Sequence, residues 1–455
     1  MTFSALDSEL TGALFASDAM RALFADRAKI AAMLKVEAAL ARAEAAAGLV
    51  PKGLAPAIDK IKAADLDFGQ LGAKTADAGV VAIPFVKAVE AKLPEALRGH
   101  FHLGATSQDI VDTALALQMA EGIALIANDL GAIINGLSAM AKAYRRTPCA
   151  GRSYGQHAAP ITFGYVAAGW LSGVADVAGE LPAIRKRALV ASLGGPVGTL
   201  AALGDKGPAV AKAFAAELGL GVGPVAAHTT RSRMAATGAW LAALIGALAK
   251  MATDVVFLSA TEVGEVAEAA AEGRGGSSAL PHKRNPVSAT VILAANAAAG
   301  GHVVTLLAAM ASANQRPAGA WQAEWHALPA LFGLASGALR EGRRIAEGLV
   351  VDKARMRANL DLTHGLLFTD AAAARLAPKL GREAAHKIVA KAAAVVRDSG
   401  KPLRAVLARD TSIPTTMLDA VFDMTPAIDA AAAMTDRAIK DAAAMRRALA
   451  PTKGR

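Results

Sequence analysis

Apolar side chains recur along most of the chain at the spacing of an α-helix. Between residues 115 and 140 they follow one another at intervals of three, four or seven residues, which places them on one helix face: Leu115, Met119, Ile126, Leu130, Ile133, Leu137 and Met140. Residues 234–251 and 287–311 have the composition of two more long helices. No run alternates convincingly between apolar and polar residues, as a half-buried strand does. The pattern therefore predicts an all-α protein.

Breaks in this pattern divide the chain into three predicted parts. Glycine and polar residues interrupt the apolar pattern between Gly99 and Ser107, and the helical patterns become shorter after Val351. We therefore expect three domains: a helical N-terminal domain over residues 1–109, a central bundle of long helices over 110–352 and a helical C-terminal domain over 353–455.

Composition narrows the class of protein. The 455 residues are 54% hydrophobic but only 4% aromatic, which favours closely packed helices because alanine is the best helix former and strands prefer aromatic and β-branched residues. The net charge of +10 leaves nucleic acid, an anionic surface and an anionic small molecule open as partners. No basic patch is interleaved with aromatic residues, so we expect no nucleic-acid partner. The basic segment 440–455 is expected to be a solvated helix end followed by a frayed tail.

Three features favour a soluble, cytoplasmic protein. The first ten residues carry Asp7 and Glu9 and no basic segment before an apolar run, unlike a secretory signal. The single cysteine, Cys149, excludes an intramolecular disulfide framework, fits a reducing compartment and lacks the context of a nucleophile. Residues 286–315 carry no charge and could cross a bilayer, but they are rich in alanine and include Asn296. We expect them to form a helix buried in protein.

The segment from Gly273 to Pro286 gathers reactive side chains in a short space. Its glycines and prolines disfavour a continuous helix, and hydroxyl, amide and basic groups stand between them: Ser277, Ser278, His282, Lys283, Arg284 and Asn285. Successive backbone N–H groups beside a lysine can hold an anion. The glycine spacing is not that of a P-loop. From these residues alone, a flexible basic surface loop remains an alternative.

Three segments carry a family resemblance. Residues 275–286 resemble the signature loop of the fumarase/aspartase superfamily, with Leu280 where most members have methionine, a change that conserves volume. Residues 102–109 resemble the Thr-Ser-x-Asp motif of that superfamily, and residues 151–160 resemble its middle region. The resemblance implies a three-domain, all-α subunit. It also implies a homotetramer in which the long helices form a common core and the active sites are shared between subunits.

The same resemblance implies catalytic roles in the loop. Ser277 is expected to transfer the proton, activated by nearby N–H groups and cations because serine is otherwise a poor base. Lys283 and Asn285 are expected to bind a substrate carboxylate and stabilise its enolate-like form.

Substrate binding is expected at the start of the first long helix. The resemblance implies that Thr106 and Ser107 hold a substrate carboxylate, with His102 nearby. Thr106 and Asp109 also have the spacing of a capping box, and this structural role is compatible with anion binding at a helix N-terminus. Arg316 either reaches a substrate carboxylate or ends the preceding buried helix.

Tyr154 separates two classes of enzyme. Members resembling adenylosuccinate lyase have a histidine there that protonates the leaving amine, whereas a carboxylate leaves as a stable anion with a pKa of about 4 and needs no such acid. Tyr154 therefore favours a cycloisomerase over a C–N lyase of the adenylosuccinate type, which remains the alternative and would release fumarate. His157 is expected to contact the substrate carboxylate or lactone, although pairing with a backbone group remains open.

Residues 199–204 and 359–363 extend the resemblance to the family of 3-carboxy-cis,cis-muconate cycloisomerases. This resemblance implies conversion of 3-carboxy-cis,cis-muconate, a small tricarboxylate of aromatic degradation, to 4-carboxymuconolactone. We expect no cofactor, and no metal-ligand spacing is visible in the sequence.

Overall fold

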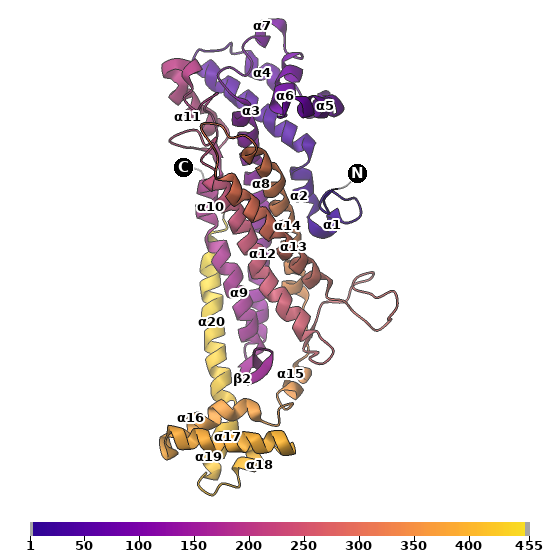
Figure 1. The fold of residues 1–455 in the computed structure, drawn as a ribbon, viewed down its shortest axis with the longest axis vertical. Helices are drawn as coiled ribbons and strands as arrows, with labels where there is room; N and C mark the ends of the chain where they lie inside the picture. The colour runs from indigo at the N-terminus through magenta and orange to yellow at the C-terminus, as the bar shows by residue number, and fades with distance from the viewer. Residues whose placement is uncertain (1–2, 451–455) are drawn as a thin grey trace.

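The computed structural model describes residues 3–450 and confirms the all-α fold. The molecule is elongated, with a head of short helices, a central bundle of long helices and a small helical foot (Figure 1). One continuous apolar core runs from the head into the bundle, while the foot has a separate apolar core. The domain boundaries at residues 109 and 352 stay predictions.

The head is built around one long helix. This helix, α3, packs against both α4 and the first long helix of the bundle, and it buries Met33, Val36 and Leu40. Helix α1 (Gly12–Phe15) lies beside the bundle (Figure 1). The helices that follow it in the N-terminal part are α2 (Asp18–Leu23), α3 (Asp26–Ala46), α4 (Leu54–Asp59), α5 (Phe68–Ala78), α6 (Ala82–Glu90) and α7 (Glu95–Arg98).

The central bundle confirms the three long helices that the apolar spacing predicts. They are α8 (Ser107–Ala143), α12 (Ser232–Leu258) and α13 (Val287–Ala309). Thr106 is the N-cap of α8, and its N–H donates to the Asp109 carboxylate at 3.0 Å, so the predicted cap forms. The other helices of this part are α9 (Phe163–Gly179), α10 (Leu181–Ala188), α11 (Gly207–Glu217) and α14 (Ala320–Gly348).

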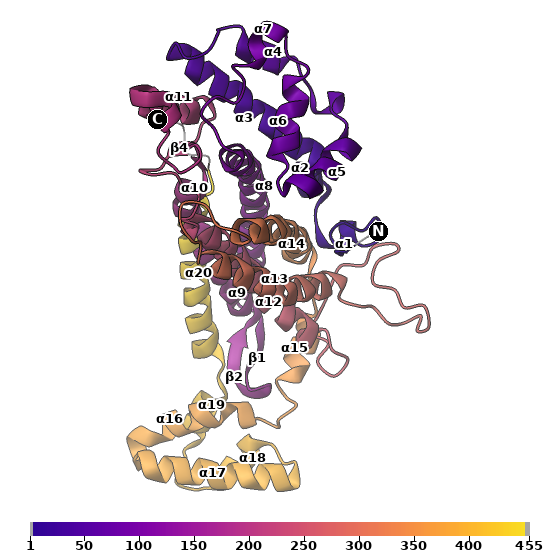
Figure 2. The same cartoon turned by 45° about the horizontal axis from the view of Figure 1, so that its top comes forward.

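The all-α fold includes one antiparallel hairpin that the sequence pattern did not indicate. Strands β1 (Pro148–Ser153) and β2 (Gln156–Thr162) form an antiparallel hairpin at the end of the bundle next to the foot (Figure 2). The hairpin contains alanine, glycine and proline, which have low strand propensity, so its sequence does not alternate visibly. Two-residue pairings occur elsewhere, between β3 (Val190–Ala191) and β4 (Gly221–Val222) and between β5 (Val266–Ala267) and β6 (Val350–Val351).

The last helix leaves the foot and returns to the bundle. The foot core is formed by α16 (Thr369–Leu380), α17 (Arg382–Ser399), α18 (Leu403–Leu407) and α19 (Thr415–Phe422), and α15 (Lys353–Asn359) leads into it. Helix α20 (Thr425–Arg447) then runs along α9 (Figure 1). Ala442 and Leu449 belong to the bundle core, so the first part of the basic segment 440–455 is partly buried; residues 451–455 lie outside the described residues.

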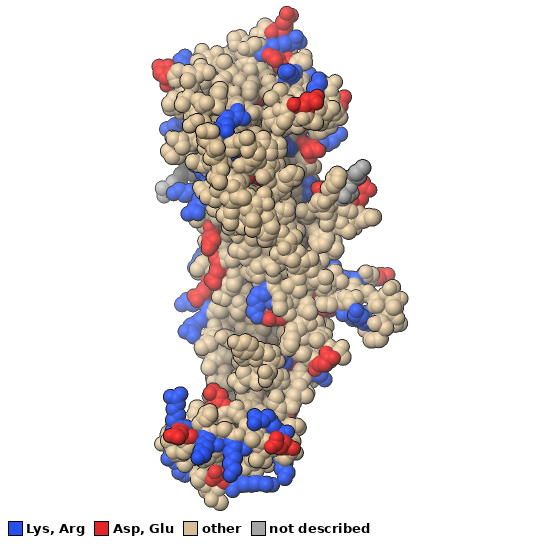
Figure 3. All heavy atoms as spheres, in the orientation of Figure 1, with Lys and Arg blue, Asp and Glu red and all other residues tan. Residues whose placement is uncertain are grey.

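The charge-free helix α13 is less buried than expected. Helices α8, α12 and α13 are long and apolar enough to cross a membrane, yet only 28% of the most apolar 18-residue window of α13 is buried within the chain. Val304, Leu307 and Met310 are exposed at this helix and its C-cap. Few charged side chains interrupt the middle of the molecular face in Figure 3, whereas Lys and Arg gather on the foot. The chain alone therefore does not provide the burial that the sequence predicts for α13.

Candidate active site

The signature loop lies between β5 and α13 and projects from the bundle (Figures 1 and 2). Its stem is closed by the Asn285 N–H, which donates to the Gly275 carbonyl at 2.8 Å. Gly275 has a φ of 71°, and a Cβ there would lie 2.7 Å from the Asn285 carbonyl oxygen. Glycine is therefore required at the stem.

Within the loop, backbone N–H groups surround the Ser277 hydroxyl oxygen. Leu280 N–H donates to Ser277 Oγ at 3.1 Å, and the Ala279 N–H lies within 3.4 Å. Such donors stabilise negative charge on the oxygen and so favour the ionised form of a hydroxyl. The exposed Lys283 side chain makes no hydrogen bond or ion pair with any residue in the described part of the chain. Asn285 Nδ2 makes a long contact of 3.5 Å to the Gly276 carbonyl.

The ends of the loop are anchored to the bundle by charged side chains. Arg274 forms an ion pair with the buried Glu341 and donates to Ser288 Oγ at 2.7 Å. On the other side, the Glu268 carboxylate accepts from the N–H groups of Ser288 and Ala289 at 3.0 and 2.9 Å, which caps α13. The stem is thus fixed while the exposed tip has few contacts.

A second group of predicted residues meets at the start of α8. Arg316, from the segment between α13 and α14, donates to Thr106 Oγ1 at 2.5 Å and to Ser107 Oγ at 3.0 Å. Each hydroxyl oxygen accepts from the guanidinium, so each hydroxyl proton remains free to be donated to a ligand. The positive end of the α8 dipole lies at the same place. The group therefore has the chemistry of a carboxylate site.

Buried polar groups hold this end of α8 in place. Asp109, with no exposed surface, accepts from Gly194 N–H at 3.0 Å and Gly195 N–H at 2.8 Å, and its Oδ1 lies 2.6 Å from His228 Nε2. These contacts attach residues 194–195 to the first turn of the helix. The sequence predicted Asp109 as a helix cap, but it did not reveal that this carboxylate also anchors a distant loop.

A buried arginine joins α8 to α14. Arg231 forms ion pairs with Asp112 at 2.6 Å and with Glu324, and Trp321 Nε1 donates to Asp112 at 2.9 Å. Burial alone would lower the pKa of Arg231, but the two carboxylates raise it above its ordinary value. The guanidinium is therefore a permanent cation that fixes the beginning of α14, just after Arg316.

His102 lies four residues before the Thr106 cap and is held from the head. Its Nδ1 lies 2.7 Å from Oε1 of Glu37 on α3. Burial alone would lower the pKa of His102, but the charge and hydrogen bond of Glu37 and the charge of Asp109 together raise it. Sequence reasoning missed Glu37, because no local pattern connects residues 65 positions apart.

The remaining predicted residues lie on the hairpin. Tyr154 and Gly155 form its two-residue turn with φ of 51° and 76°, and the Tyr154 side chain is fully exposed. Both φ values are positive, as in a type I′ turn. His157 is half-buried, and burial together with the nearby Arg152 lowers its pKa, while Glu265 opposes this. Its Nδ1 is buried and has no partner among the described residues.

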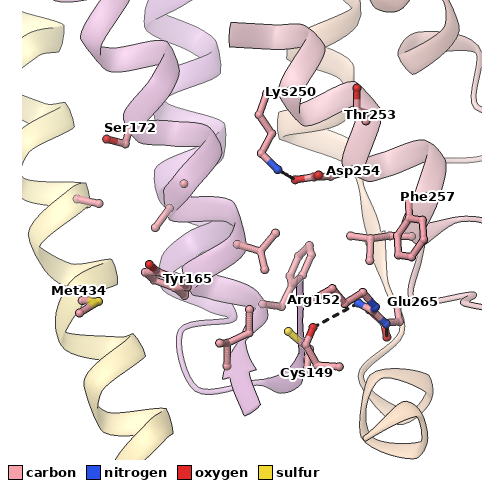
Figure 4. Close-up of a pocket in the computed structure, with 18 of the residues that line it drawn as sticks. Cys149, Arg152, Tyr165, Ser172, Lys250, Thr253, Asp254, Phe257, Glu265 and Met434 are labelled. Atoms are coloured by element: carbon pink, nitrogen blue, oxygen red, sulfur yellow. Dashed lines mark hydrogen bonds and ion pairs between the residues drawn. The ribbon is translucent and has the colours of Figure 1, made fainter. Parts of the chain in front are cut away.

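A cavity of about 870 Å³ opens beside this hairpin, between α9, α12 and α20 (Figure 4). It is lined by Arg152, which forms an ion pair of 2.5 Å with the buried Glu265, and by the ion pair between Lys250 and Asp254. Cys149 also lines it, but burial, with Glu265, raises the pKa of this thiol to about 12. None of the predicted site residues lines this cavity.

The predicted residues therefore form three separate groups within one chain. His102, Thr106, Ser107 and Arg316 meet at the head end of α8, whereas Tyr154 and His157 lie beyond its other end. The 37 residues of α8 span about 55 Å at roughly 1.5 Å per residue. In the described residues, no hydrogen bond joins the tip of the signature loop to either group. Nor do residues 3–450 contain a group of three or more His, Cys, Asp or Glu side chains placed to hold a metal ion.

Comparisons with known proteins agree over nearly the whole chain. A family model described as "Lyase" matches residues 14–301, and one described as "Adenylosuccinate lyase C-terminus" matches residues 365–438. The 3-carboxy-cis,cis-muconate cycloisomerase of Pseudomonas putida is 44% identical over 413 residues, which are 90% of this chain and 98% of that protein. The nitrosuccinate lyase of Streptomyces davaonensis is 38% identical over 450 residues, 95% of each chain.

Solved structures agree as well. The crystal structure of 3-carboxy-cis,cis-muconate lactonizing enzyme from Pseudomonas putida matches with a TM-score of 0.90 and 40% identity. The match covers 96% of this chain and 100% of that chain.

Proposed function

Because the chain belongs to the lyase family that includes the 3-carboxy-cis,cis-muconate cycloisomerases, we propose that it converts 3-carboxy-cis,cis-muconate to 4-carboxymuconolactone in the degradation of protocatechuate. The observation that carries this activity is the 44% identity to such an enzyme over 98% of that enzyme's length. The chain is thus an intramolecular lyase that acts on a small molecule.

The signature loop supplies the reaction chemistry in this proposal. One substrate carboxylate forms a new C–O bond to the conjugated double bond, and the displaced electron pair moves toward a neighbouring carboxylate. Lys283 and Asn285 stabilise that developing charge. Ser277 Oγ then gives its proton to carbon, and its own negative charge is stabilised by the Leu280 N–H at 3.1 Å. Solvent reprotonates the serine, so the substrate with three carboxylates takes up one proton overall and leaves as a lactone with two carboxylates.

The start of α8 binds a second carboxylate of the substrate. Thr106 and Ser107 donate their hydroxyl protons to it, while Arg316, which already donates to both hydroxyl oxygens, supplies the positive charge. His102 binds beside them. The net charge of +10 attracts a substrate with three carboxylates to this site.

The hairpin distinguishes a cycloisomerase from a C–N lyase. Tyr154 stands where adenylosuccinate-lyase-like enzymes have an acid for the leaving amine, and a lactone-forming carboxylate needs none. His157, with its lowered pKa, is neutral near pH 7 and contacts the substrate as a hydrogen-bonding group. The match of residues 365–438 to the adenylosuccinate lyase C-terminus supports the second candidate function, a C–N lyase that releases fumarate.

The active site is assembled from several subunits of a homotetramer. Support comes from the length of α8, about 55 Å, which separates Thr106 from Tyr154 within one chain. Exposed apolar side chains on α12 and α13, including Phe257 and Val304, provide the surface for a common helical core. This core would cover the apolar helix α13 without a membrane. The enzyme is soluble, and we place it in the cytoplasm.

An ultraviolet assay tests the activity directly. Loss of the conjugated carboxymuconate absorbance without fumarate release is the expected result, and fumarate release from a succinyl adduct without carboxymuconate turnover would establish the alternative. Ser277→Ala should reduce kcat by about 100- to 10,000-fold, as expected for loss of the proton-transferring group. Ser278→Ala, the neighbouring exposed hydroxyl, serves as a matched control that should keep turnover within a few fold. Undiminished turnover in Ser277→Ala would contradict the assigned role.

Mixing subunits tests the shared sites. Ser277→Ala and Arg316→Ala each disable every site of their own homotetramer. Coexpressed, the two chains should form some sites that contain neither substitution, so that activity returns to part of the wild-type value. Failure of the mixed tetramers to regain activity would show that both residues act from the same subunit.

A further inference from the structure

His102 has an unusual backbone conformation at the entrance to α8. Its φ is 60°, in the left-handed region that a non-glycine residue occupies only at a cost. Its ring is not anchored by its own segment but by α3, through the contact of 2.7 Å between Nδ1 and Glu37 Oε1. The side chain is 18% exposed, whereas Glu37 is 1% exposed. The carboxylate thus reaches the histidine from the interior of the head.

Burial of the Glu37 carboxylate costs folding free energy. Its second oxygen, Oε2, is buried and has no partner among the described residues, and an incompletely satisfied buried carboxylate costs folding free energy. The contact to His102 is the only hydrogen bond or ion pair of the Glu37 carboxylate in the described chain. Packing alone would be served better by an apolar residue of the same volume. The cost points to a role outside stability.

We propose that Glu37 is a positioning residue for the cyclisation: it fixes the His102 ring through Nδ1 and keeps it as an imidazolium whose Nε2–H donates to a substrate carboxylate. The inference rests on the proposed function, since it assigns a partner to a residue of the proposed substrate site. With Nδ1–H directed at Glu37, a neutral ring would present the lone pair of Nε2 to the substrate and repel a carboxylate. Only the protonated ring presents a donor.

The surrounding charges support this protonation state. The groups that act on His102 are Glu37 from α3 and Asp109 from α8, and both are acidic. Burial lowers the pKa of His102, and these two carboxylates more than compensate, so that the pKa is raised. Arg316, which donates to the Thr106 and Ser107 hydroxyls, is not among the groups that shift the pKa of His102. Removal of the Glu37 charge should therefore lower the pKa of His102, so that the ring loses its proton at a lower pH than in the wild type.

The same helix offers a matched control. Glu44 lies seven residues after Glu37 on α3, two helical turns away, and is also 1% exposed. Burial, together with the charge of Glu37, raises the pKa of Glu44 to about 8. Glu44 is therefore largely neutral at pH 7, and Glu44→Gln removes little charge at that pH.

The first test compares the pH dependence of KM. For the wild type, KM for carboxymuconate should begin to rise at a higher pH than it does in Glu37→Gln, because Glu37 raises the pKa of His102. For Glu37→Gln, KM should be close to the wild-type value at pH 5.5 and several-fold higher than the wild-type value at alkaline pH, because loss of the Glu37 charge lowers the pKa of His102. Glu44→Gln should follow the wild type at pH 7. A Glu37→Gln variant whose KM is raised equally at pH 5.5 and pH 8 would have a structural defect, and the proposal would be wrong.

The second test does not depend on turnover. Diethyl pyrocarbonate reacts with an imidazole only in its neutral form. The rate at which the peptide that contains His102 is modified, measured by mass spectrometry at several pH values, therefore gives the pKa of that ring. The midpoint should fall in Glu37→Gln and stay unchanged in a control variant such as Lys250→Met, because Lys250 lies beside the hairpin at the other end of the bundle. Equal midpoints in the wild type and Glu37→Gln would overturn the proposal. If the wild type does not consume carboxymuconate but the midpoint shifts, the proposed function fails while the pairing stands.

Discussion

Arg231 lies between two buried carboxylates of the bundle, Asp112 and Glu324. Its replacement by methionine removes the cation that pairs with both of them. Arg231 is 2% exposed, and its partners Asp112 and Glu324 are 4% and 1% exposed. Methionine keeps much of the side-chain volume, so the perturbation is mainly electrostatic. Burial already raises the pKa of Glu324 against the opposing effect of Arg231. Without the guanidinium, both carboxylates would be buried without a counter-ion.

The size of the effect follows from this burial. Removal of one partner of a buried ion pair typically costs about 3–5 kcal/mol in the free energy of unfolding. At roughly 2 °C per kcal/mol for a large chain, the melting temperature should fall by about 6–10 °C. Arg343→Met is the matched control, because Arg343 and Glu347 form an ion pair that is 47% and 48% exposed. A pair of this kind contributes at most about 1 kcal/mol.

Thermal unfolding followed by circular dichroism at several pH values measures both variants. In Arg231→Met the unpaired carboxylates take up protons more readily in the folded than in the unfolded state, so the deficit should shrink as the pH falls from 7 to 5. The Arg343→Met deficit should stay small throughout. An Arg231→Met protein that melts within 2 °C of the wild type at pH 7 would refute the reasoning, as would a deficit that does not change with pH.

Three further predictions concern single groups. Gly275→Ala should lower kcat more than tenfold at unchanged helix content, because its Cβ would lie 2.7 Å from the Asn285 carbonyl oxygen and force the two sides of the loop stem apart. A wild-type kcat in this variant would show that the closed stem is not needed for turnover. Glu44→Gln should be more stable than the wild type at alkaline pH. The pKa of Glu44 is about 8 in the folded protein and 4.5 in the unfolded chain, so the wild type loses folding free energy as the pH rises from 4.5 to 8. A difference in melting temperature that stays constant from pH 5 to 8 would refute this. Cys149, with its pKa raised to about 12, should resist iodoacetamide at pH 8 until the chain unfolds, which intact-mass measurement checks; rapid alkylation of the folded protein would contradict its burial.

The sequence could reveal the long helices because their signal is periodic and local. Leu130 and Leu137 on α8 repeat the spacing of a buried helix face over several turns, and both are fully buried. The Thr106–Asp109 cap is equally local, since the two groups that meet are three residues apart. Such features can be predicted from a short stretch of sequence, without knowledge of the rest of the fold.

Other features arise only from contacts between distant parts of the chain. The pairing of Glu37 with His102 has no local pattern, and the hairpin around Tyr154 consists of residues with weak strand propensity. A Tyr-Gly turn is a weak signal of a hairpin because tyrosine rarely adopts a positive φ. The position of Arg316 beside Thr106 depends on how α13 and α14 are joined. In each case tertiary packing, not propensity, decides the arrangement.

The return of α20 to α9 affects how the chain is made. Translation adds about 5–20 residues per second, so α20 follows α9 by about 260 residues and roughly 13–50 seconds. During that time α9 lacks the helix that runs along it, and the bundle core lacks the Ala442 and Leu449 side chains. The unfinished bundle therefore has an exposed apolar seam while it is still attached to the ribosome. Chains that end before Thr425 would retain this seam permanently, which makes premature termination a route to aggregation.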